Sequence, residues 1–242
     1  MNEAFRTLGT PARGGIVAVC DHAANTVPPG IDLGVPAAAM ARHIAWDIGV
    51  AGVAGHMAAA YAIPAFLATF SRLVIDPNRE EDSPGLIPEV SDGIAIPGNA
   101  GADREGRLAR FHRPYHAELA AWLAAAEPAL ILSIHSFTPA LESGSAPRPW
   151  QVGILYNTDV RAPRIAIPLL AAQGLVVGDN RPYSGRALNA TMNRHAEAHG
   201  RPYLGIEIRN DLIAEPGGQA RWGDLVVGLA HTVVRALTRA AP

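Results

Sequence analysis

Three short apolar runs in this sequence each end at a residue that can carry chemistry. Such runs are typical of strands that are buried on both faces of a parallel sheet. The runs and the polar residues that follow them are 131–134 before His135, 16–20 before Asp21 and His22, and 203–206 before Glu207. Because ligands bind beyond the carboxyl ends of the strands in open α/β sheets, we expect these three ends to meet at one site.

Strand and helix patterns alternate along the 242 residues with mostly short connections. Strands are predicted at residues 16–20, 64–70, 73–75, 130–135, 151–156, 175–178 and 203–209. Helices are predicted at residues 36–61, 103–126, 163–173, 190–199 and 218–237. Residues 1–14 look like a loose lead-in, and residues 82–101 form a long loop of a kind that is often functional. The alternation predicts an α/β fold, a three-layer αβα single domain over residues 1–242.

Composition excludes several classes of protein. The net charge of −2 indicates neither a nucleic-acid footprint nor a basic membrane patch. All twenty basic residues are arginines, which excludes a Schiff-base lysine and a P-loop lysine. The single cysteine, Cys20, excludes an internal disulfide and a cysteine-rich metal site. Because neither a signal-peptide pattern nor an apolar stretch of membrane-spanning length is found, we expect a soluble cytoplasmic protein, with its oligomeric state open.

The turn after residues 16–20 carries candidate metal ligands. His22 and Asn25 lie three residues apart, a spacing from which one turn can hold a divalent ion, and zinc would then need a distant ligand such as His135. The alternative is a loop whose polar side chains only cap turns. Asp47 lies four residues after His43 on a predicted helix and is another candidate oxygen ligand, although such pairs are often structural.

Glu207 and the arginines suggest a catalytic carboxylate beside an anion-binding pocket. A buried carboxylate is costly unless it is paired or functional, and near a metal it could exchange protons with water and with a leaving nitrogen. The alternative is a salt bridge with Arg209, which strand alternation places on the same face. Arg72 and Arg79 could hold the carboxylates of an acidic substrate in bidentate fashion.

Other side chains allow further hypotheses. Cys20 lies near His22 and permits a Cys–His nucleophile, but a lone cysteine at the end of a buried strand is more often a small hydrophobe. His195 is a candidate proton-handling group. The histidines expected to be solvated or at the edge of the core are His56, His112, His116, His199 and His231.

Several motifs, in their joint order, resemble those of the N-formylglutamate amidohydrolase family. The matching segments are residues 20–25, 45–49, 71–79, 135–137, 179–183 and 207–213. The resemblance implies a phosphorylase/hydrolase-like α/β fold with a mixed central sheet, related to zinc carboxypeptidases. It also implies hydrolysis of N-formyl-L-glutamate to formate and L-glutamate, late in histidine breakdown.

The resemblance also implies roles for particular residues. His22 and His135 match positions that hold one divalent metal ion, zinc by family resemblance, and Glu207 matches the general base and acid. Zinc carboxypeptidases carry a glutamate three residues after the first histidine, where this chain has Asn25. The predicted residues are Glu207 and His135 for catalysis, His22, His135 and Asn25 for the metal (with Asp47 or Asp21 as the alternative third ligand), and Arg72, Arg79, Arg209, Asn180 and Ser136 for the substrate.

The predicted function is metal-dependent hydrolysis of the N-acyl amide of an acidic amino acid, with a small molecule as the only partner expected. Family likeness does not by itself fix the substrate. Two alternatives are a related N-acyl amino acid deacylase or carboxypeptidase-like hydrolase, and a non-catalytic protein that binds dicarboxylates through its arginines.

Overall fold

The most apolar stretches of the chain form the centre of one mixed sheet. The computed structural model describes residues 3–141, 143–144 and 146–240. Its main sheet has the strand order β1 (Phe5–Leu8), β3 (Ala65–Ala68), β2 (Ile16–Cys20), β6 (Leu130–Phe137), β9 (Tyr203–Arg209), β7 (Val152–Leu155) and β8 (Val177–Asp179). The four strands β3, β2, β6 and β9 are parallel, whereas β1 and β7 run antiparallel to their inner neighbours.

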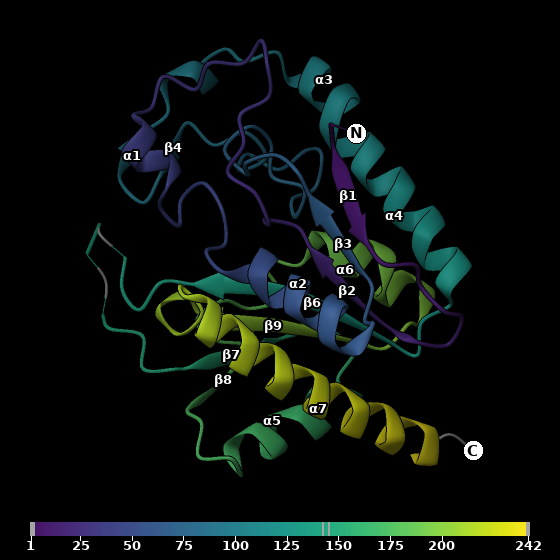
Figure 1. The fold of residues 1–242 in the computed structure, drawn as a ribbon. Helices are drawn as coiled ribbons and strands as arrows, with labels where there is room; N and C mark the ends of the chain where they lie inside the picture. Colours follow the sequence, from purple (N-terminus) through teal and green to yellow (C-terminus); the bar gives the residue numbers. More distant parts are fainter. Residues whose placement is uncertain (1–2, 142, 145, 241–242) are drawn as a thin grey trace.

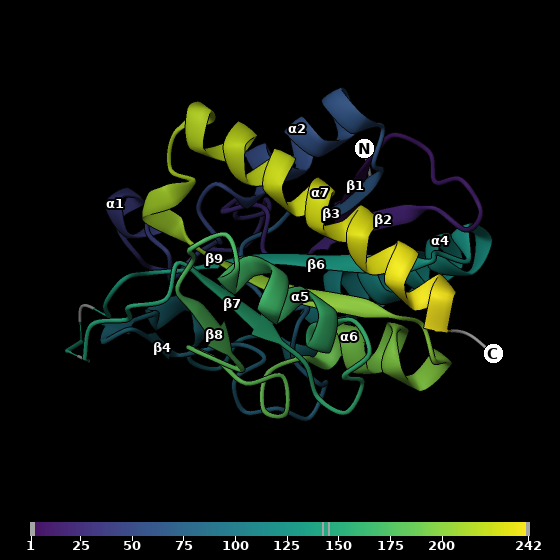
Figure 2. The ribbon, with the colours of Figure 1, turned by 90° about the horizontal axis from the view of Figure 1, so that it is seen from below.

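Helices cover both faces of this sheet and form two separate cores. On one face lie α2 (Val50–Tyr61), α5 (Pro163–Ala171) and α7 (Pro216–Ala240); on the other lie α4 (Arg113–Ala126) and α6 (Ala190–His195) (Figures 1 and 2). Two cores form because successive side chains of a strand point to opposite faces of the sheet. On β2, Ala18 and Cys20 belong to the first core, and Val17 and Val19 belong to the second. The predicted three-layer α/β domain with a mixed central sheet is confirmed.

Short elements connect these layers. They are α1 (Ala37–Met40), the hairpin β4 (Val90–Ser91) and β5 (Ile94–Ala95), η1 (Pro97–Asn99), α3 (Arg104–Arg107), a turn of π-helix η2 (Leu108–His112), η3 (Glu197–His199) and η4 (Asn210–Leu212). Asp103 caps α3, since its Oδ1 accepts a hydrogen bond of 2.9 Å from the Gly106 N–H. None of the helices within the described residues is both long enough and apolar enough to cross a lipid bilayer.

The single helix predicted over residues 36–61 is wrong. The structure has α1 and α2 instead, separated by turns over residues 41–49. Gly49 adopts a φ of 87°, which a helix does not allow, and a Cβ there would collide with the Ile213 carbonyl oxygen. His43 and Asp47 therefore do not share a helical face. Instead, the Asp47 N–H donates to the His22 carbonyl oxygen at 2.9 Å, which draws Asp47 to the end of β2.

Two further predictions of local structure are wrong. Residues 73–75 form a buried turn rather than a strand, because the Arg72 N–H bonds to the Ala45 carbonyl instead of to a neighbouring strand. Residues 5–8 form the edge strand β1 rather than part of a loose lead-in, and Phe5 stacks on Phe66 with ring centroids 4.7 Å apart. The hairpin of β4 and β5 and the turn η1 were not predicted, since they lie within the predicted loop of residues 82–101. The other predicted helices and strands are present with ends shifted by a few residues, and the predicted helix of residues 103–126 consists of α3, η2 and α4 in succession.

Candidate active site

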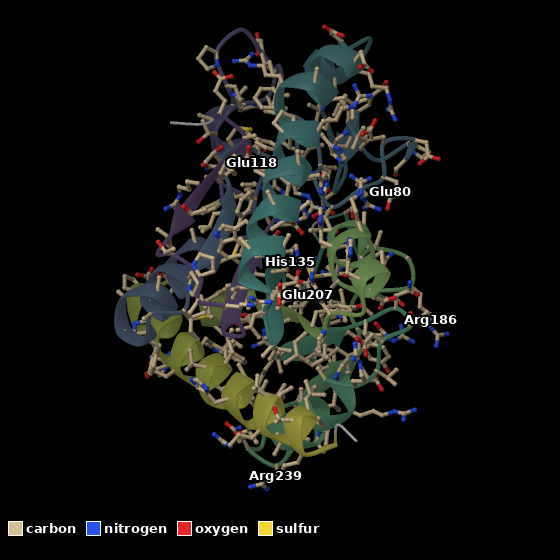
Figure 3. All side chains as sticks on the ribbon, turned by 90° about the vertical axis from the view of Figure 1, so that its right-hand side faces the viewer. Glu80, Glu118, His135, Arg186, Glu207 and Arg239 are labelled. Atoms are coloured by element: carbon tan, nitrogen blue, oxygen red, sulfur yellow. The ribbon has the colours of Figure 1, made fainter. Side chains whose placement is uncertain are left out.

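The three predicted strand ends meet at one place. The strands β2, β6 and β9 are neighbours in the sheet, and His135 and Glu207 are register partners on β6 and β9. The rings of His22 and His135 have their centroids 5.1 Å apart. Figure 3 shows the side chains of His135 and Glu207 next to each other. Because parallel neighbours end at the same edge of the sheet, residues far apart in the sequence become neighbours here.

Asp47 lies between the two histidines. Its Oδ2 is 2.9 Å from His135 Nδ1 and 3.4 Å from His22 Nδ1. The same oxygen accepts a hydrogen bond of 3.2 Å from the Ser136 N–H, which fixes the carboxylate against the end of β6. Ligand atoms of His22, Asp47 and His135 all lie within 4.8 Å of one another, and all three residues are buried.

Two more carboxylates face the outer nitrogens of the histidine rings. Asp76 Oδ1 lies 2.7 Å from His22 Nε2 and therefore accepts its proton. Asp21 Oδ2 lies 3.5 Å from His135 Nε2, at ion-pair distance, while its Oδ1 accepts a hydrogen bond of 2.6 Å from the Tyr115 hydroxyl. Asp76 was not among the predicted ligands or catalytic residues, although its position after the apolar residues 73–75 was a usable signal.

The carboxylates determine how these histidines titrate. Burial and Arg72 oppose the protonation of His22, but Asp76 and Asp47 outweigh them and raise its pKa. Burial also opposes the protonation of His135, yet hydrogen bonds to Asp21 and Asp47 raise its pKa well above the usual range. Burial acts against the ionised form of Asp47 too, but the two histidines hold its pKa far below that of an exposed aspartate. The site is thus built for positive charge held between anions.

This donor set fits a divalent metal ion. Two imidazole nitrogens and one carboxylate oxygen are common zinc ligands. Asp76 accepts the proton on His22 Nε2, so a ring that gives up its second proton to make room for an ion would have its lone pair on Nδ1. This buried Nδ1 lies 3.4 Å from Asp47 Oδ2 and has no hydrogen-bond partner within the described residues. A carboxylate behind each metal-binding histidine is a common way to fix the tautomer and orientation of the ring. His22, Asp47 and His135 could hold the ion.

Glu207 differs from Asp47 and Asp76, because no arginine lies at ion-pair distance from it within the described residues, whereas Arg72 pairs with both aspartates. Its side chain is 6% exposed, and its Oε2 has no hydrogen-bond partner among the residues described. Burial raises its pKa to about 7, with Asp47 adding to the shift and His135 opposing it. A carboxyl group that gains and loses a proton near neutral pH is suited to general acid–base work.

A pocket of about 550 Å³ opens onto this cluster. Arg72 and Arg79 both line it. Arg72 bridges two carboxylates, with one nitrogen 2.7 Å from Asp76 Oδ2 and the other 3.6 Å from Asp47 Oδ1. Arg79 is held more loosely, with its Nε 3.8 Å from Asp76 Oδ2, so its guanidinium is the more available for an anionic ligand.

Three of the predicted ligand or substrate residues lie away from the pocket. Asn25 donates from its amide to the Met40 carbonyl at 2.8 Å, and Arg209 pairs with Asp211 at 2.8 Å instead of with Glu207. Asn180 accepts hydrogen bonds from the Tyr156 and Gly185 N–H groups. None of these three lines the pocket, whereas Ser136 does, with its hydroxyl donating to the Ile48 carbonyl.

The cysteine lies in surroundings that disfavour a nucleophilic thiolate. Cys20 is fully buried in the core between the sheet and α2, and burial raises the pKa of its thiol far above the usual range. His112, His116 and His195 are buried on the other face, so the expectation that His112 and His116 are solvated or at the core edge is wrong. Tertiary contacts of α4 with α6 cause this burial, and a helical spacing alone does not reveal it.

The site combines a candidate metal cluster, a buried carboxyl group with a pKa near neutral and a pocket lined by arginines. This combination is typical of a hydrolase that acts on polar small molecules. Comparison with known proteins agrees. The sequence model of the N-formylglutamate amidohydrolase family matches residues 14–214. The chain therefore belongs to the N-formylglutamate amidohydrolase family, and it is an amidohydrolase.

Solved structures show the same fold. A gene product of Agrobacterium tumefaciens is 31% identical, with a TM-score of 0.91 over 98% of this chain and 96% of that one. N-formylglutamate amidohydrolase from Ralstonia eutropha is 20% identical, with a TM-score of 0.71 over 99% of this chain and 100% of that one. Among curated protein sequences no significant match was found.

Proposed function

We propose that this protein hydrolyses the N-acyl amide of an acidic amino acid in a metal-dependent reaction, with N-formyl-L-glutamate as the substrate and formate and L-glutamate as products. The observation that carries the proposal is the placement of Glu207 as the register partner of His135, next to the cluster of His22, Asp47 and His135. Membership of the family supports the amide as the bond that is cleaved.

His22, His135 and Asp47 would hold the ion, with Asp76 and Asp21 behind the histidines. An ion in such a site supplies a Lewis acid that polarises the amide carbonyl and eases the loss of a proton from water. In the proposal Asp47, rather than Asn25, is the oxygen ligand, because the Asn25 amide is bonded to the Met40 carbonyl outside the pocket.

Glu207 handles the proton. In its ionised form it accepts a proton from the attacking water, whose oxygen forms the new bond to the formyl carbon. It then gives this proton to the amide nitrogen as the carbon–nitrogen bond breaks, so the amino acid leaves as an amine. A pKa of about 7, set by burial, suits both steps because neither protonation state is strongly favoured at neutral pH.

The arginines supply charge complementarity to an acidic substrate. Arg79, the less constrained of the two, pairs with a substrate carboxylate, and Arg72 places positive charge beside the cluster where an oxyanion develops. A pocket of about 550 Å³ readily admits a small N-acyl amino acid. A protein that only binds dicarboxylates would have no use for a buried, unpaired Glu207, so the catalytic function is favoured.

The proposal is tested by formate release from N-formyl-L-glutamate with Glu207→Gln and a matched control. The variant keeps the size of the side chain but cannot exchange a proton, so kcat should fall by about 10³-fold while bound metal is retained. Glu118→Gln changes an exposed glutamate on α4 and should leave kcat unchanged. Near-normal turnover by Glu207→Gln would show that the proton role is wrongly assigned.

A further inference from the structure

A second group of histidines lies behind the active site. His112 at the end of η2, His116 on α4 and His195 on α6 form a buried row of rings. His112 meets His116 edge-on with ring centroids 4.4 Å apart, and His116 stacks on His195 with centroids 5.1 Å apart. None of them lines the pocket. Within the described part of the chain, His22, Asp47 and His135 have the geometry of a metal site, and this row of histidines does not. Its use must therefore lie in what its nitrogens contact.

The directions of its hydrogen bonds follow from the acceptors. His116 Nε2 lies 2.9 Å from the carbonyl oxygen of Pro77, which can only accept, so Nε2 carries the proton. In the neutral ring Nδ1 is then an acceptor, and it lies 2.9 Å from His195 Nε2, which must donate. Burial lowers the pKa of His116 to about 3 and that of His195 to about 4, consistent with neutral rings.

The row of histidines contacts the backbone of residues 76–79 on the side away from the pocket. His112 Nε2 donates to the Arg79 carbonyl at 3.0 Å, two residues beyond the Pro77 carbonyl that His116 holds. Between them, Asn78 accepts a hydrogen bond of 3.0 Å from the Thr191 N–H at the start of α6. Three consecutive residues of this segment are thus anchored to α4, η2 and α6.

The opposite side of the same segment faces the active site. Asp76, directly before Pro77, accepts the proton of His22 Nε2 at 2.7 Å and holds Arg72 at 2.7 Å. Arg79, whose backbone carbonyl is held by His112, extends its guanidinium along the pocket wall. A shift of the backbone at Pro77 would move Asp76 relative to His22, and a shift at Arg79 would move the guanidinium.

We propose that the three histidines are positioning residues with divided tasks: His116, supported by His195, sets Asp76 against His22 and so raises the affinity for the ion, whereas His112 sets Arg79 and so strengthens substrate binding. The inference rests on the proposed function, because it assumes an ion at His22 and an acidic substrate at Arg79. It adds three residues that touch neither ion nor substrate.

The first arm of the test measures zinc affinity by competition with a chromogenic chelator, which needs no turnover. His116→Met fills the space but removes the shorter of two hydrogen bonds to the Pro77 carbonyl, leaving the one of 3.4 Å from the Thr191 hydroxyl. We expect zinc to bind about 10- to 100-fold more weakly. His116→Gln keeps a donor and an acceptor and should restore most of the loss. In an Asp76→Asn background, His116→Met should add little, because its effect passes through Asp76.

The second arm measures KM for N-formyl-L-glutamate. His112→Met should raise KM by about 3- to 10-fold with zinc affinity unchanged, since one hydrogen bond to the Arg79 carbonyl is lost, and His112→Gln should recover it. If His116→Met does not fold, His195→Met and His195→Gln replace it. His195→Met should weaken zinc binding to a smaller extent than expected for His116→Met, and His195→Gln should restore most of that loss.

The outcomes separate the two proposals. The positioning role would be overturned, and the proposed function left standing, if wild-type protein bound zinc while His116→Met and His116→Gln had equal zinc affinities. Losses that add fully to that of Asp76→Asn would also overturn it, because a general destabilisation is additive. Wild-type protein that binds no divalent metal would instead refute the metal site of the proposed function.

Discussion

Two groups of buried histidines lie on either side of residues 76–79, and they differ in what faces their nitrogens. The rings of His22 and His135 face carboxylates, and their pKa values are raised although burial opposes this. The rings of His116 and His195 face a backbone carbonyl and each other, and burial lowers their pKa values. The same side chain at similar burial is thus prepared for a cation in one place and for neutrality in the other.

In this protein the group that faces the ring nitrogens, a carboxylate or a backbone carbonyl, decides the role of an imidazole, and burial does not. A carboxylate supplies charge that a metal ion can share, so a histidine next to it becomes a ligand. A carbonyl supplies only a dipole, so a histidine next to it serves as a fixed donor. Asp76 and Pro77 are adjacent in the chain yet face the two different groups.

The largest effect is expected when one histidine of the first group is removed. His22→Ala deletes a proposed metal ligand and leaves Asp76 and Asp47 without its imidazole, so formate release should fall by about 10⁴-fold together with loss of bound metal. His231→Ala, which changes an exposed histidine on α7, is the matched control and should keep full activity. Retention of both metal and activity by His22→Ala would remove the contrast between the two groups.

A smaller effect is expected on the free energy of unfolding of the protein in acid, through His116 of the second group. His116 has a folded pKa of about 3, below the 6.5 of the unfolded chain, so between these values only the unfolded chain binds its proton and stability falls as the pH falls. Each such group contributes a slope of about 1.4 kcal/mol per pH unit. When metal-free protein is unfolded in urea at about pH 6 and about pH 5, His116→Gln should therefore lose about 1 kcal/mol less than wild type.

An equal pH dependence in wild type and His116→Gln would mean that His116 is not held neutral in the folded protein. His231→Gln, which changes an exposed histidine on α7, is again the matched control, and its loss of stability should equal that of wild type.

Much of the central site could be predicted because its residues follow apolar runs. His22, His135 and Glu207 each follow or end a run that the sequence shows as a strand, and parallel neighbours bring their ends together. The resemblance to the family supplied the reaction class, which the family model confirms. Their assigned roles in the chemistry stay predictions.

The place of Asp47, which was predicted only as an alternative third ligand, and the features that were missed, Asp76 and the burial of His116, depend on contacts between distant segments. Asp47 lies between the histidines only because Gly49 breaks the predicted helix and the Asp47 N–H bonds to the His22 carbonyl. Asp76 follows a buried turn whose partners belong to other segments. The burial of His116 depends on α6, and no period in the sequence of α4 shows which of its polar residues another helix will cover.

The proposed reaction requires that His22, Asp47 and His135 bind a divalent ion. The most direct measurement is zinc titration of chelator-treated protein with formate release followed in the same samples. We expect activity to be lost on chelation and to return in proportion to added zinc until one equivalent is bound, with neither zinc binding nor recovery in His135→Ala. Full formate release by metal-free protein, or zinc binding of unchanged affinity in His135→Ala, would contradict it.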